Sequence, residues 1–295
     1  MTIVGQRFDM VYSTLISATE LRSILSSTKT LVFDVRFSLT DVAYGQRAYA
    51  SGHIPGAIYL HLDHDLSGAK SPTTGRHPLP DIEVFGERIR SLGVSSDVQV
   101  IVYDDAAGMF AARCWWLLRW LGHHAVAVLD GGLPAWIQSG GEQSEEVPGD
   151  RLPGTFRPVA NPDMLVQVDQ LQAGLAAGRI SLCDARAPER FRGDVEPIDK
   201  VAGHVPGAFN RPFASNLNSD GQFKSADELA AIHFPPGQDA SDRRLVHMCG
   251  SGVTACHNVL AAAIAGKPLP ALYAGSWSEW ITDPTRPVAA GKDLS

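Results

Sequence analysis

The sequence predicts an α/β fold made of two tandem halves, each a mostly parallel β-sheet with helices on both of its faces. The first observation behind this prediction is an internal repeat. Gly-His-Ile-Pro-Gly-Ala at residues 52–57 returns as Gly-His-Val-Pro-Gly-Ala at residues 203–208. The second is the alternation of short apolar runs with longer helical patterns in both halves. The third is length, because 295 residues are long for one core and suit two domains of ordinary size.

Corresponding elements surround the two copies of the repeat. A short strand with a charged end precedes each copy, and a strand of the buried type follows it. The predicted strands are residues 31–36, 100–103, 180–186 and 245–248, and the predicted helices are residues 84–92, 109–121, 226–232 and 253–264. Each half then closes on a glycine followed five residues later by a tryptophan, Trp136 and Trp280. The order of elements is therefore duplicated.

The chain divides into a first domain at residues 1–140, a linker at residues 141–163 and a second domain at residues 164–295. The stretch around the linker is rich in Gly, Pro, Ser, Glu and Asp and has no sustained hydrophobic period, which is typical of a connecting segment. The repeated hexapeptide has a structural interpretation. Its glycines and proline fix a turn, and we expect His53 and His204 to bond the backbone around it.

Composition excludes several classes of function. The formal net charge of −7 argues against nucleic-acid binding and against anchoring to an anionic membrane. No apolar run approaches the roughly 20 residues that span a bilayer, and residues 1–10 lack the apolar core of a signal peptide. The four cysteines show no Cys-x-x-Cys spacing, so we expect no metal site, no disulfide framework and a cytoplasmic location.

Cys249 is the strongest candidate for chemistry. It follows the apolar run that ends at Met248 and opens a glycine-rich loop, residues 250–254, before a helical pattern begins. A strand, a tight loop and a helix in this order aim backbone N–H groups and the positive end of the helix dipole at the sulfur. Such surroundings favour a thiolate and can lower a cysteine pKa from ~8.5 into the range ~3.5–7.5. The same N–H groups would solvate a persulfide.

The loop Cys-Gly-Ser-Gly-Val-Thr-Ala, residues 249–255, resembles the active loop of the 3-mercaptopyruvate sulfurtransferases, a branch of the rhodanese superfamily. The duplicated order of elements resembles the tandem pair of rhodanese-like domains. This resemblance implies that Cys249 takes sulfane sulfur from 3-mercaptopyruvate as a persulfide and that pyruvate is released. The sulfur then passes to a thiol, such as that of thioredoxin, or to cyanide. No cofactor is implied.

The resemblance also implies roles for residues around Cys249. Ser251, His77 and Asp63 match a serine–histidine–aspartate relay that assists the keto-acid substrate beside the cysteine. Arg190 matches the arginine that binds the substrate carboxylate, a task suited to a planar bidentate donor. The loop residues expected to line the substrate site are Gly250, Gly252, Val253 and Thr254.

The sequence departs from the family pattern in one place, and its two halves differ from each other in another. The animal enzymes carry a second arginine after a Glu-Pro pair, where this chain has Ile198. Arg192 and Lys200 are the candidates to supply the missing charge. Asp104 stands at the strand end of the first half where the second half has Cys249, so we expect the first half to be catalytically silent. The residues that follow, 105–109, do not reproduce the glycine-rich loop, and no amide cradle is expected there.

Other residues have structural interpretations. Arg186 is expected to form an ion pair within the framework of its own domain. Cys114, Cys183 and Cys256 are expected in the core. Trp115, Trp116 and Trp120 are expected to pack in the core and between the domains.

Three alternative functions stay open. A thiosulfate sulfurtransferase would share the fold, although the thiosulfate-using rhodaneses that the loop resembles have basic residues directly after the cysteine. A persulfide relay module, without turnover of a small donor, would need only Cys249 and its loop. A cysteine phosphatase would need an arginine six residues after the cysteine, and Ala255 stands there.

Overall fold

Two parallel β-sheets form the centre of the computed structural model, which describes residues 11–149, 151–234 and 243–291. The first sheet has the order β1-β5-β4-β2-β3, and the second has the order β7-β6-β8-β9. The strands are β1 (Leu15–Ile16), β2 (Thr30–Asp34), β3 (Ile58–Tyr59), β4 (Gln99–Tyr103), β5 (Val126–Leu129), β6 (Ile180–Asp184), β7 (Phe209–Asn210), β8 (Arg244–Met248) and β9 (Ala271–Leu272). All neighbouring strands are parallel.

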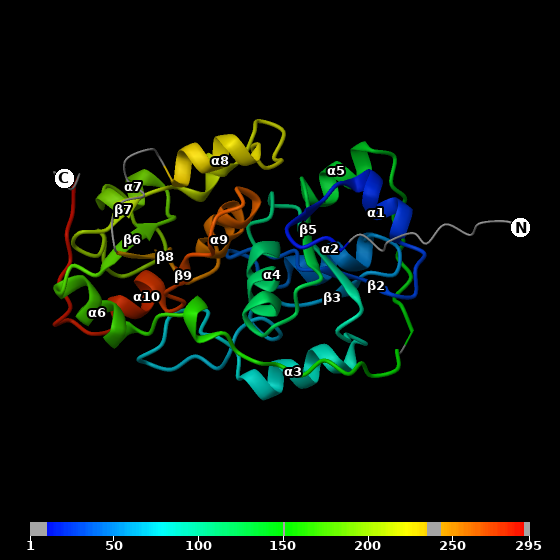
Figure 1. Cartoon of the computed structure of the whole chain (residues 1–295), viewed down its shortest axis with the longest axis horizontal. Helices are drawn as coiled ribbons and strands as arrows, with labels where there is room; N and C mark the ends of the chain where they lie inside the picture. Colours follow the sequence, from blue (N-terminus) through cyan, green and yellow to red (C-terminus); the bar gives the residue numbers. More distant parts are fainter. Residues whose placement is uncertain (1–10, 150, 235–242, 292–295) are drawn as a thin grey trace, which may run out of the picture.

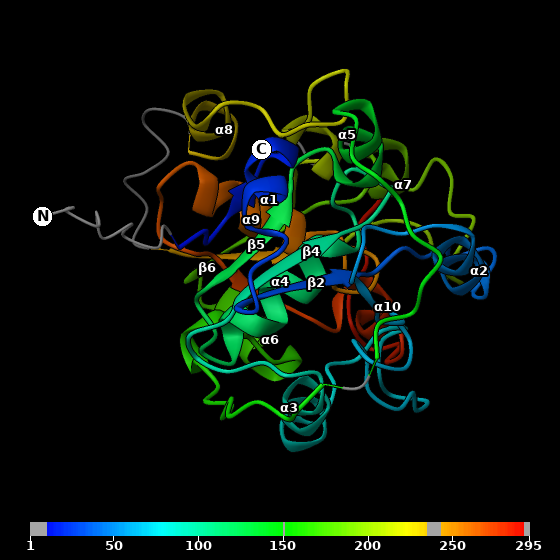
Figure 2. The same cartoon turned by 90° about the vertical axis from the view of Figure 1, so that its right-hand side faces the viewer.

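Helices cover both faces of the sheets, which confirms the predicted fold class. Figure 2 shows α1 and α5 on one side of the first sheet and α3 on the other. The helices are α1 (Ala18–Ile24), α2 (Tyr44–Ser51), α3 (Ile82–Ser91), α4 (Ala111–Trp120), α5 (Gly132–Gln138), α6 (Val168–Ala176), α7 (Pro188–Arg192), α8 (Ala226–His233), α9 (Ala255–Ile264) and α10 (Ser276–Trp280). Two 3₁₀ turns, η1 (Pro162–Met164) and η2 (Phe213–Asn216), complete the second half.

The two halves repeat one another in detail. Asp34 at the end of β2 accepts bonds from Arg36, whose Nη2 also donates to the carbonyl of Gly52 at 2.8 Å. Arg186 makes the same two kinds of bond in the second half, including one to a glycine carbonyl of the second hexapeptide at 2.8 Å. The expected framework role of Arg186 is the arrangement observed.

The histidines of the two hexapeptides bond the backbone. Nδ1 of His53 lies 2.8 Å from the carbonyl oxygen of Tyr49, and Nδ1 of His204 lies 2.7 Å from that of Phe191. Each ring also stacks on the side chain of that partner, with ring centroids 3.9 Å apart in both cases. These contacts fix the turn of each hexapeptide and are the backbone bonds expected of the two histidines.

Helices α4 and α9 join the halves into one body (Figure 1). Trp115, Trp116 and Trp120 of α4 are buried in an apolar cluster that also contains Val259 and Leu260 of α9. The cluster therefore runs across the boundary between the domains, as expected of these tryptophans.

The segment between the domains lies along the first half. Ser144 pairs with His53 in an isolated antiparallel bridge, and Phe156 donates its N–H to the carbonyl of Val94 at 3.1 Å. Near its end, Asn161 donates to the carbonyl of Trp120 at 2.9 Å. These bonds hold much of residues 141–161 against the first half.

Candidate active site

Cys249 directly follows β8 and is 1% exposed. Its N–H donates to Oγ of Ser276 at 3.1 Å, and its carbonyl accepts from the N–H of Trp277 at 3.0 Å. The start of α10 thus holds the backbone of the cysteine on one side. A cavity of about 60 Å³ opens beside it, lined by Leu39, Arg76, Met109, Phe110, Arg190, Ile198, Cys249, Gly250, Ser251, Val253 and Thr254.

Three of the four loop residues expected at the substrate site line this cavity, and Gly252 does not. Gly252 has φ +75°, in the left-handed region that favours glycine. A methyl group there would lie 2.1 Å from the carbonyl oxygen of Ala274. Gly252 is therefore required by the turn and by close packing rather than by contact with the cavity.

The corresponding loop of the first half shows what such a turn can bind. Asp104 follows β4 and is fully buried. One carboxylate oxygen accepts the N–H groups of Ala106 and Gly108, both at 2.9 Å, and the other accepts those of Phe110 and Ala111, both at 2.8 Å. The expectation that this loop forms no amide cradle is wrong, because the turn and the start of α4 aim their N–H groups inward without a glycine-rich sequence.

The second-half loop begins at the equivalent point but carries no anion of its own. In both sheets the central strands end in register, and the next residue is Asp104 in one half and Cys249 in the other. The N–H groups of residues 250–254 bond no acceptor among the described residues. The loop therefore keeps amide donors for a negative charge on Cys249 or on a group bound to it.

The other cysteines are buried thiols outside the cavity. Burial raises the pKa of Cys256 to about 12, and its sulfur lies 3.3 Å from the carbonyl oxygen of Gly252. Burial likewise raises the pKa of Cys114 and of Cys183. All three are core residues, as expected, and neutral thiols are poor nucleophiles.

Ser251, His77 and Asp63 lie in a chain that crosses from one half to the other. Nδ1 of His77 lies 2.7 Å from Oγ of Ser251, and its Nε2 lies 3.5 Å from Oδ1 of Asp63. That oxygen also accepts a bond from Lys70 at 3.1 Å. Burial, reinforced by the charge of Arg113, lowers the pKa of His77 to about 3. The ring is therefore neutral at neutral pH. With its one N–H proton on Nε2, facing Asp63, its Nδ1 accepts a hydrogen bond from the Ser251 hydroxyl.

Arg113 of α4 is a fully buried cation that reaches the loop from the first half. Its Nη1 donates to the carbonyl of Gly252 at 3.0 Å, and its Nη2 donates to the carbonyl of His77 at 3.2 Å. Burial lowers the pKa of Arg113, while Cys256 and Cys249 act in the opposite direction. Arg113 ties the loop after Cys249 to the backbone of His77 and sets a positive charge behind that loop.

Arg190, in α7, lines the cavity and is held by two buried carboxylates. Its Nη2 donates to Oε1 of Glu196 at 2.7 Å and to Oδ2 of Asp199 at 3.1 Å, and its Nε lies 3.1 Å from the same Glu196 oxygen. Both acids have side chains no more than 5% exposed. Such pairing fixes the guanidinium in one orientation at the mouth of the cavity.

Ile198 also lines the cavity and occupies the place where the family pattern has a second arginine. Neither residue expected to compensate for it is among the lining residues. Arg192 pairs instead with Asp194 at 2.8 Å, and Lys200 follows the carboxylates without reaching the cavity.

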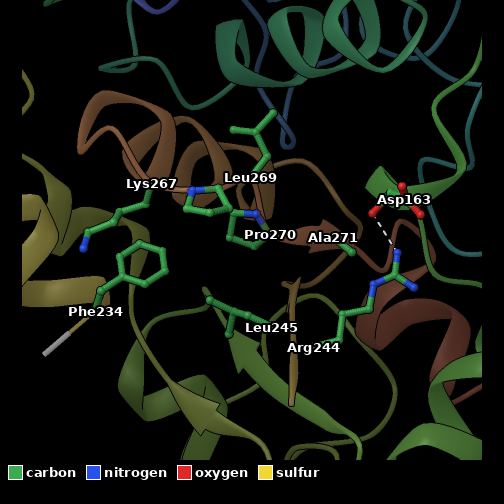
Figure 3. A pocket seen from close by; sticks show the side chains of 9 residues that line it. Asp163, Phe234, Arg244, Leu245, Lys267, Leu269, Pro270 and Ala271 are labelled. Carbon is green, nitrogen blue, oxygen red and sulfur yellow. Dashed lines mark hydrogen bonds between the residues drawn. The ribbon is translucent and has the colours of Figure 1, made fainter. Parts of the chain in front are cut away.

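A larger cavity of about 370 Å³ lies at the opposite end of the second sheet (Figure 3). Arg244, the first residue of β8, donates to the carbonyl of Asp163 there at 2.7 Å. Cys249 follows the last residue of the same strand, so this cavity is separated from it by the length of β8. It is lined by Asp163, Phe234, Arg244, Leu245, Lys267, Pro268, Leu269, Pro270 and Ala271.

Two further features bear on the class of function. Over residues 11–149, 151–234 and 243–291, no group of three or more His, Cys, Asp or Glu side chains is arranged to hold a metal ion. Within the same ranges, every helix is too short or too polar to cross a membrane.

Sequence reasoning missed two arginines of the site, Arg76 and Arg113. Arg76 directly precedes the predicted relay residue His77, and that position is the only sequence signal for it. Arg113 lies in a predicted helix among apolar residues, where a lone arginine could equally face solvent. Both reach the site only because the first half docks on the second.

Comparison with known proteins agrees with this geometry. The model of the rhodanese-like domain matches residues 17–139 and 167–283. A Pseudomonas aeruginosa protein named "Probable 3-mercaptopyruvate sulfurtransferase" is 48% identical over 94% of this chain and 98% of its own length. The thiosulfate sulfurtransferase of Rattus norvegicus is 35% identical over 96% and 97%. The crystal structure of a 3-mercaptopyruvate sulfurtransferase from Escherichia coli superposes with a TM-score of 0.77 at 33% identity, covering 91% of this chain and all of that one.

Proposed function

This chain belongs to the rhodanese family of sulfurtransferases, and we propose that it moves sulfur from 3-mercaptopyruvate to a nucleophilic acceptor through a persulfide on Cys249. One observation carries the proposal. Cys249 is the only cysteine that lines the cavity, and it shares that cavity with Arg190 and with a loop whose amides bond no other described group.

The chemistry needs two displacements. The Cys249 thiolate attacks the sulfur of 3-mercaptopyruvate, an S–S bond forms, and the C–S bond breaks. The electron pair of that bond stays on carbon as the enolate of pyruvate, which takes up a proton, while the new persulfide loses one. An acceptor thiolate or cyanide then attacks the outer sulfur and restores the Cys249 thiolate. No electron is gained or lost overall, and no cofactor is required.

The loop stabilises the negative charge on sulfur in both displacement steps. In the first half, four amides of the equivalent turn bond the Asp104 carboxylate. In the second half we assign the same task to the amides of residues 250–254, with the outer sulfur of the persulfide as their acceptor. Arg113 contributes a buried positive charge behind the loop.

The donor is positioned by its carboxylate and its carbonyl. Arg190 binds the carboxylate, and the Ser251 hydroxyl turns from Nδ1 of His77 to donate its single proton to the hydrogen bond with the carbonyl oxygen, where negative charge develops as the enolate forms. His77 and Asp63 orient that hydroxyl. Because the pKa of His77 is about 3, we assign it an orienting role and not that of a base that stores a proton.

The relay makes a testable prediction. Ser251→Ala is expected to lower kcat with 3-mercaptopyruvate by roughly 10²-fold, since one donor to the developing oxyanion is lost. Discharge of a preformed persulfide by cyanide should be unchanged, because that step forms no enolate. The wild-type pH profile of kcat should show no histidine step between pH 5 and 8, since His77 stays neutral until the pH falls towards 3. An equal loss in both half-reactions would contradict this role.

Donor preference tests the proposed function directly. With one acceptor thiol, kcat/KM is expected to be higher for 3-mercaptopyruvate than for thiosulfate. Residues 250–255 carry no charge, and the two guanidiniums at the cavity are matched in charge by Glu196 and Asp199, so the second negative charge of thiosulfate has no further cation to offset it. A thiosulfate value that is equal or higher would favour the alternative suggested by the rat enzyme. Pyruvate and sulfide release no faster than in the uncatalysed mixture would favour a persulfide relay module.

The proposal also assigns a role to each domain, a class of acceptor and a cellular location. Residues 1–140 form the silent domain that walls the cavity, residues 141–163 link it, and residues 164–295 form the catalytic domain. The acceptor is a thiol, for which thioredoxin or a small thiol is chemically able, or cyanide. A cytoplasmic location suits the four free cysteines, which a reducing compartment maintains.

A further inference from the structure

We propose that Arg113 is a positioning residue for the persulfide and acts through the peptide group between Gly252 and Val253. Arg113 belongs to α4 of the first half and fixes the carbonyl of this peptide group, so that the N–H of Val253, on the other side, bonds the outer sulfur carried by Cys249. This inference rests on the proposed function, because it names the residue of the other domain on which that amide donor depends.

The two loops have the same backbone turn at the third residue after the strand-end side chain. That residue is Ala107 in the first half and Gly252 in the second, and both have a positive φ, 55° and 75°. Alanine rarely adopts this conformation, so the surrounding turn must impose it at residue 107. The peptide group that follows the third residue therefore has a corresponding place in each half.

In the first half this peptide group is bonded on both sides. The N–H of Gly108 donates to Oδ1 of Asp104 at 2.9 Å. The carbonyl oxygen of Ala107 lies 3.1 Å from Nε2 of His257, which belongs to α9 of the other half. A trans peptide points its N–H away from its C=O, so one group makes both contacts. The other domain thus fixes the carbonyl end while the amide end faces the anion.

The second half has the reciprocal contact. Nη1 of Arg113 donates to the carbonyl of Gly252 at 3.0 Å, where α4 packs against α9 (Figure 1). The N–H of Val253 bonds no acceptor among the residues that the structure describes, and Val253 lines the cavity beside Cys249. By equivalence with Gly108, this N–H faces the side chain at the end of the strand.

The two contacts differ in charge. Burial lowers the pKa of His257 to about 4, so a neutral ring holds the loop after Asp104. Arg113 brings a guanidinium that donates to backbone carbonyls, and in the part of the chain that the structure describes no carboxylate pairs with it. A cation at the carbonyl end polarises the peptide group and makes its N–H a stronger donor. The charged contact lies on the loop whose anion, in the proposed reaction, is formed and removed.

The outer sulfur of a persulfide corresponds to the Asp104 oxygen that accepts such a bond. In an aspartate this oxygen is the third atom beyond Cα, after Cβ and Cγ. In a cysteine persulfide the outer sulfur is the third atom, after Cβ and Sγ, and the sulfur of the free cysteine is one atom nearer to the backbone. The N–H of Val253 therefore favours the persulfide form of Cys249 over the free form, and Arg113 strengthens this preference.

Sulfur exchange with a small thiol measures the preference. In a mixture of glutathione and glutathione persulfide, the outer sulfur passes to Cys249 as one S–S bond breaks and another forms, with no net oxidation. Arg113→Met removes the charge and is expected to lower the equilibrium ratio of persulfide to free enzyme by roughly 10-fold, the effect of weakening one hydrogen bond to a charged group. Mass spectrometry of the intact protein gives this ratio.

His257→Leu is the matched control, because it removes the corresponding donor from the loop after Asp104. This variant should unfold at a lower temperature and keep the wild-type ratio of persulfide to free enzyme, since that loop does not contact the sulfur. An equal fall in both variants would show that the ratio follows the docking of the domains and would overturn the role of Arg113. An unchanged ratio in Arg113→Met would overturn it as well.

The NMR signal of the Val253 amide keeps the inference testable if Arg113→Met does not fold. Formation of the persulfide is expected to move this signal in the wild type and to move it less in Arg113→Lys, whose compact ammonium cannot span the carbonyls of Gly252 and His77. The signal of Gly108, whose acceptor is permanent, serves as the reference. An equal shift in the wild type and Arg113→Lys would reject this inference, whereas a wild type that takes no sulfur from 3-mercaptopyruvate would reject the proposed function.

Discussion

The Cys249→Ser variant is expected to lose sulfur transfer from every donor while unfolding at nearly the wild-type temperature. A serine hydroxyl cannot form a persulfide, so the first displacement has no product. The backbone bonds of residue 249 to Ser276 and Trp277 do not involve the sulfur and are kept in the variant. The measurements are pyruvate release, thermal unfolding, and mass spectrometry for an adduct of one sulfur atom after exposure to the donor.

Cys256→Ser is the matched control and should retain most of the activity. It replaces a thiol seven residues along the same segment, whose pKa is raised to about 12 and which does not line the cavity. An adduct found on Cys256, Cys183 or Cys114 would show that the loop after Cys249 does not determine which cysteine carries the sulfur. An adduct confined to Cys249 in the wild type and absent from the serine variant is the expected pattern.

The local sequence was sufficient to predict the strand, the loop and the helix around Cys249. An apolar run, a cysteine, a glycine-rich turn and a helical pattern predict β8, the loop and α9 in that order, and the structure contains all three. The hexapeptide repeat predicts the duplication because each copy closes the same turn in its own sheet. Where burial, periodicity and turn chemistry agree, the prediction is confirmed.

Other parts could not be predicted from local pattern. Strands β1, β3, β7 and β9 have two residues each, too few to show an alternation of apolar and polar side chains. Asp63 and His77 were identified only through the family resemblance, because residues of these types at such separations from Ser251 occur in almost any chain. Arg76 and Arg113 depend on how one domain docks on the other, and no short-range signal encodes that.

The two loops show how one turn serves structure in one half and chemistry in the other. In both, a central strand ends, the chain turns, and the start of a helix aims its N–H groups inward. In the first half the side chain at the strand end supplies the anion, so the amides are satisfied permanently. In the second half the side chain is a small sulfur, and the amides bond no other described group, which is the arrangement that the proposed persulfide step requires.

Asp104→Asn is accordingly expected to destabilise the protein by about 2–6 kcal/mol. An amide group has one oxygen, so its NH₂ must face two of the four buried N–H donors, and each unsatisfied donor costs about 1–3 kcal/mol. The four bonds at Asp104, of which two are lost, are 2.8–2.9 Å long and lie at a fully buried residue. The free energy of unfolding from denaturant titration measures the loss, with the slope of the transition unchanged.

Asp97→Asn makes the same chemical change at an exposed position and provides the comparison. Asp97 pairs with Lys29 at 3.0 Å with both side chains 63% exposed, so its loss should alter the free energy of unfolding by less than about 1 kcal/mol. If Asp104→Asn were as mild as Asp97→Asn, the amides of the first loop would not depend on an anion. The equivalent amides would then have no counterpart in the first half for stabilising a negatively charged sulfur at Cys249, even if Cys249→Ser were inactive.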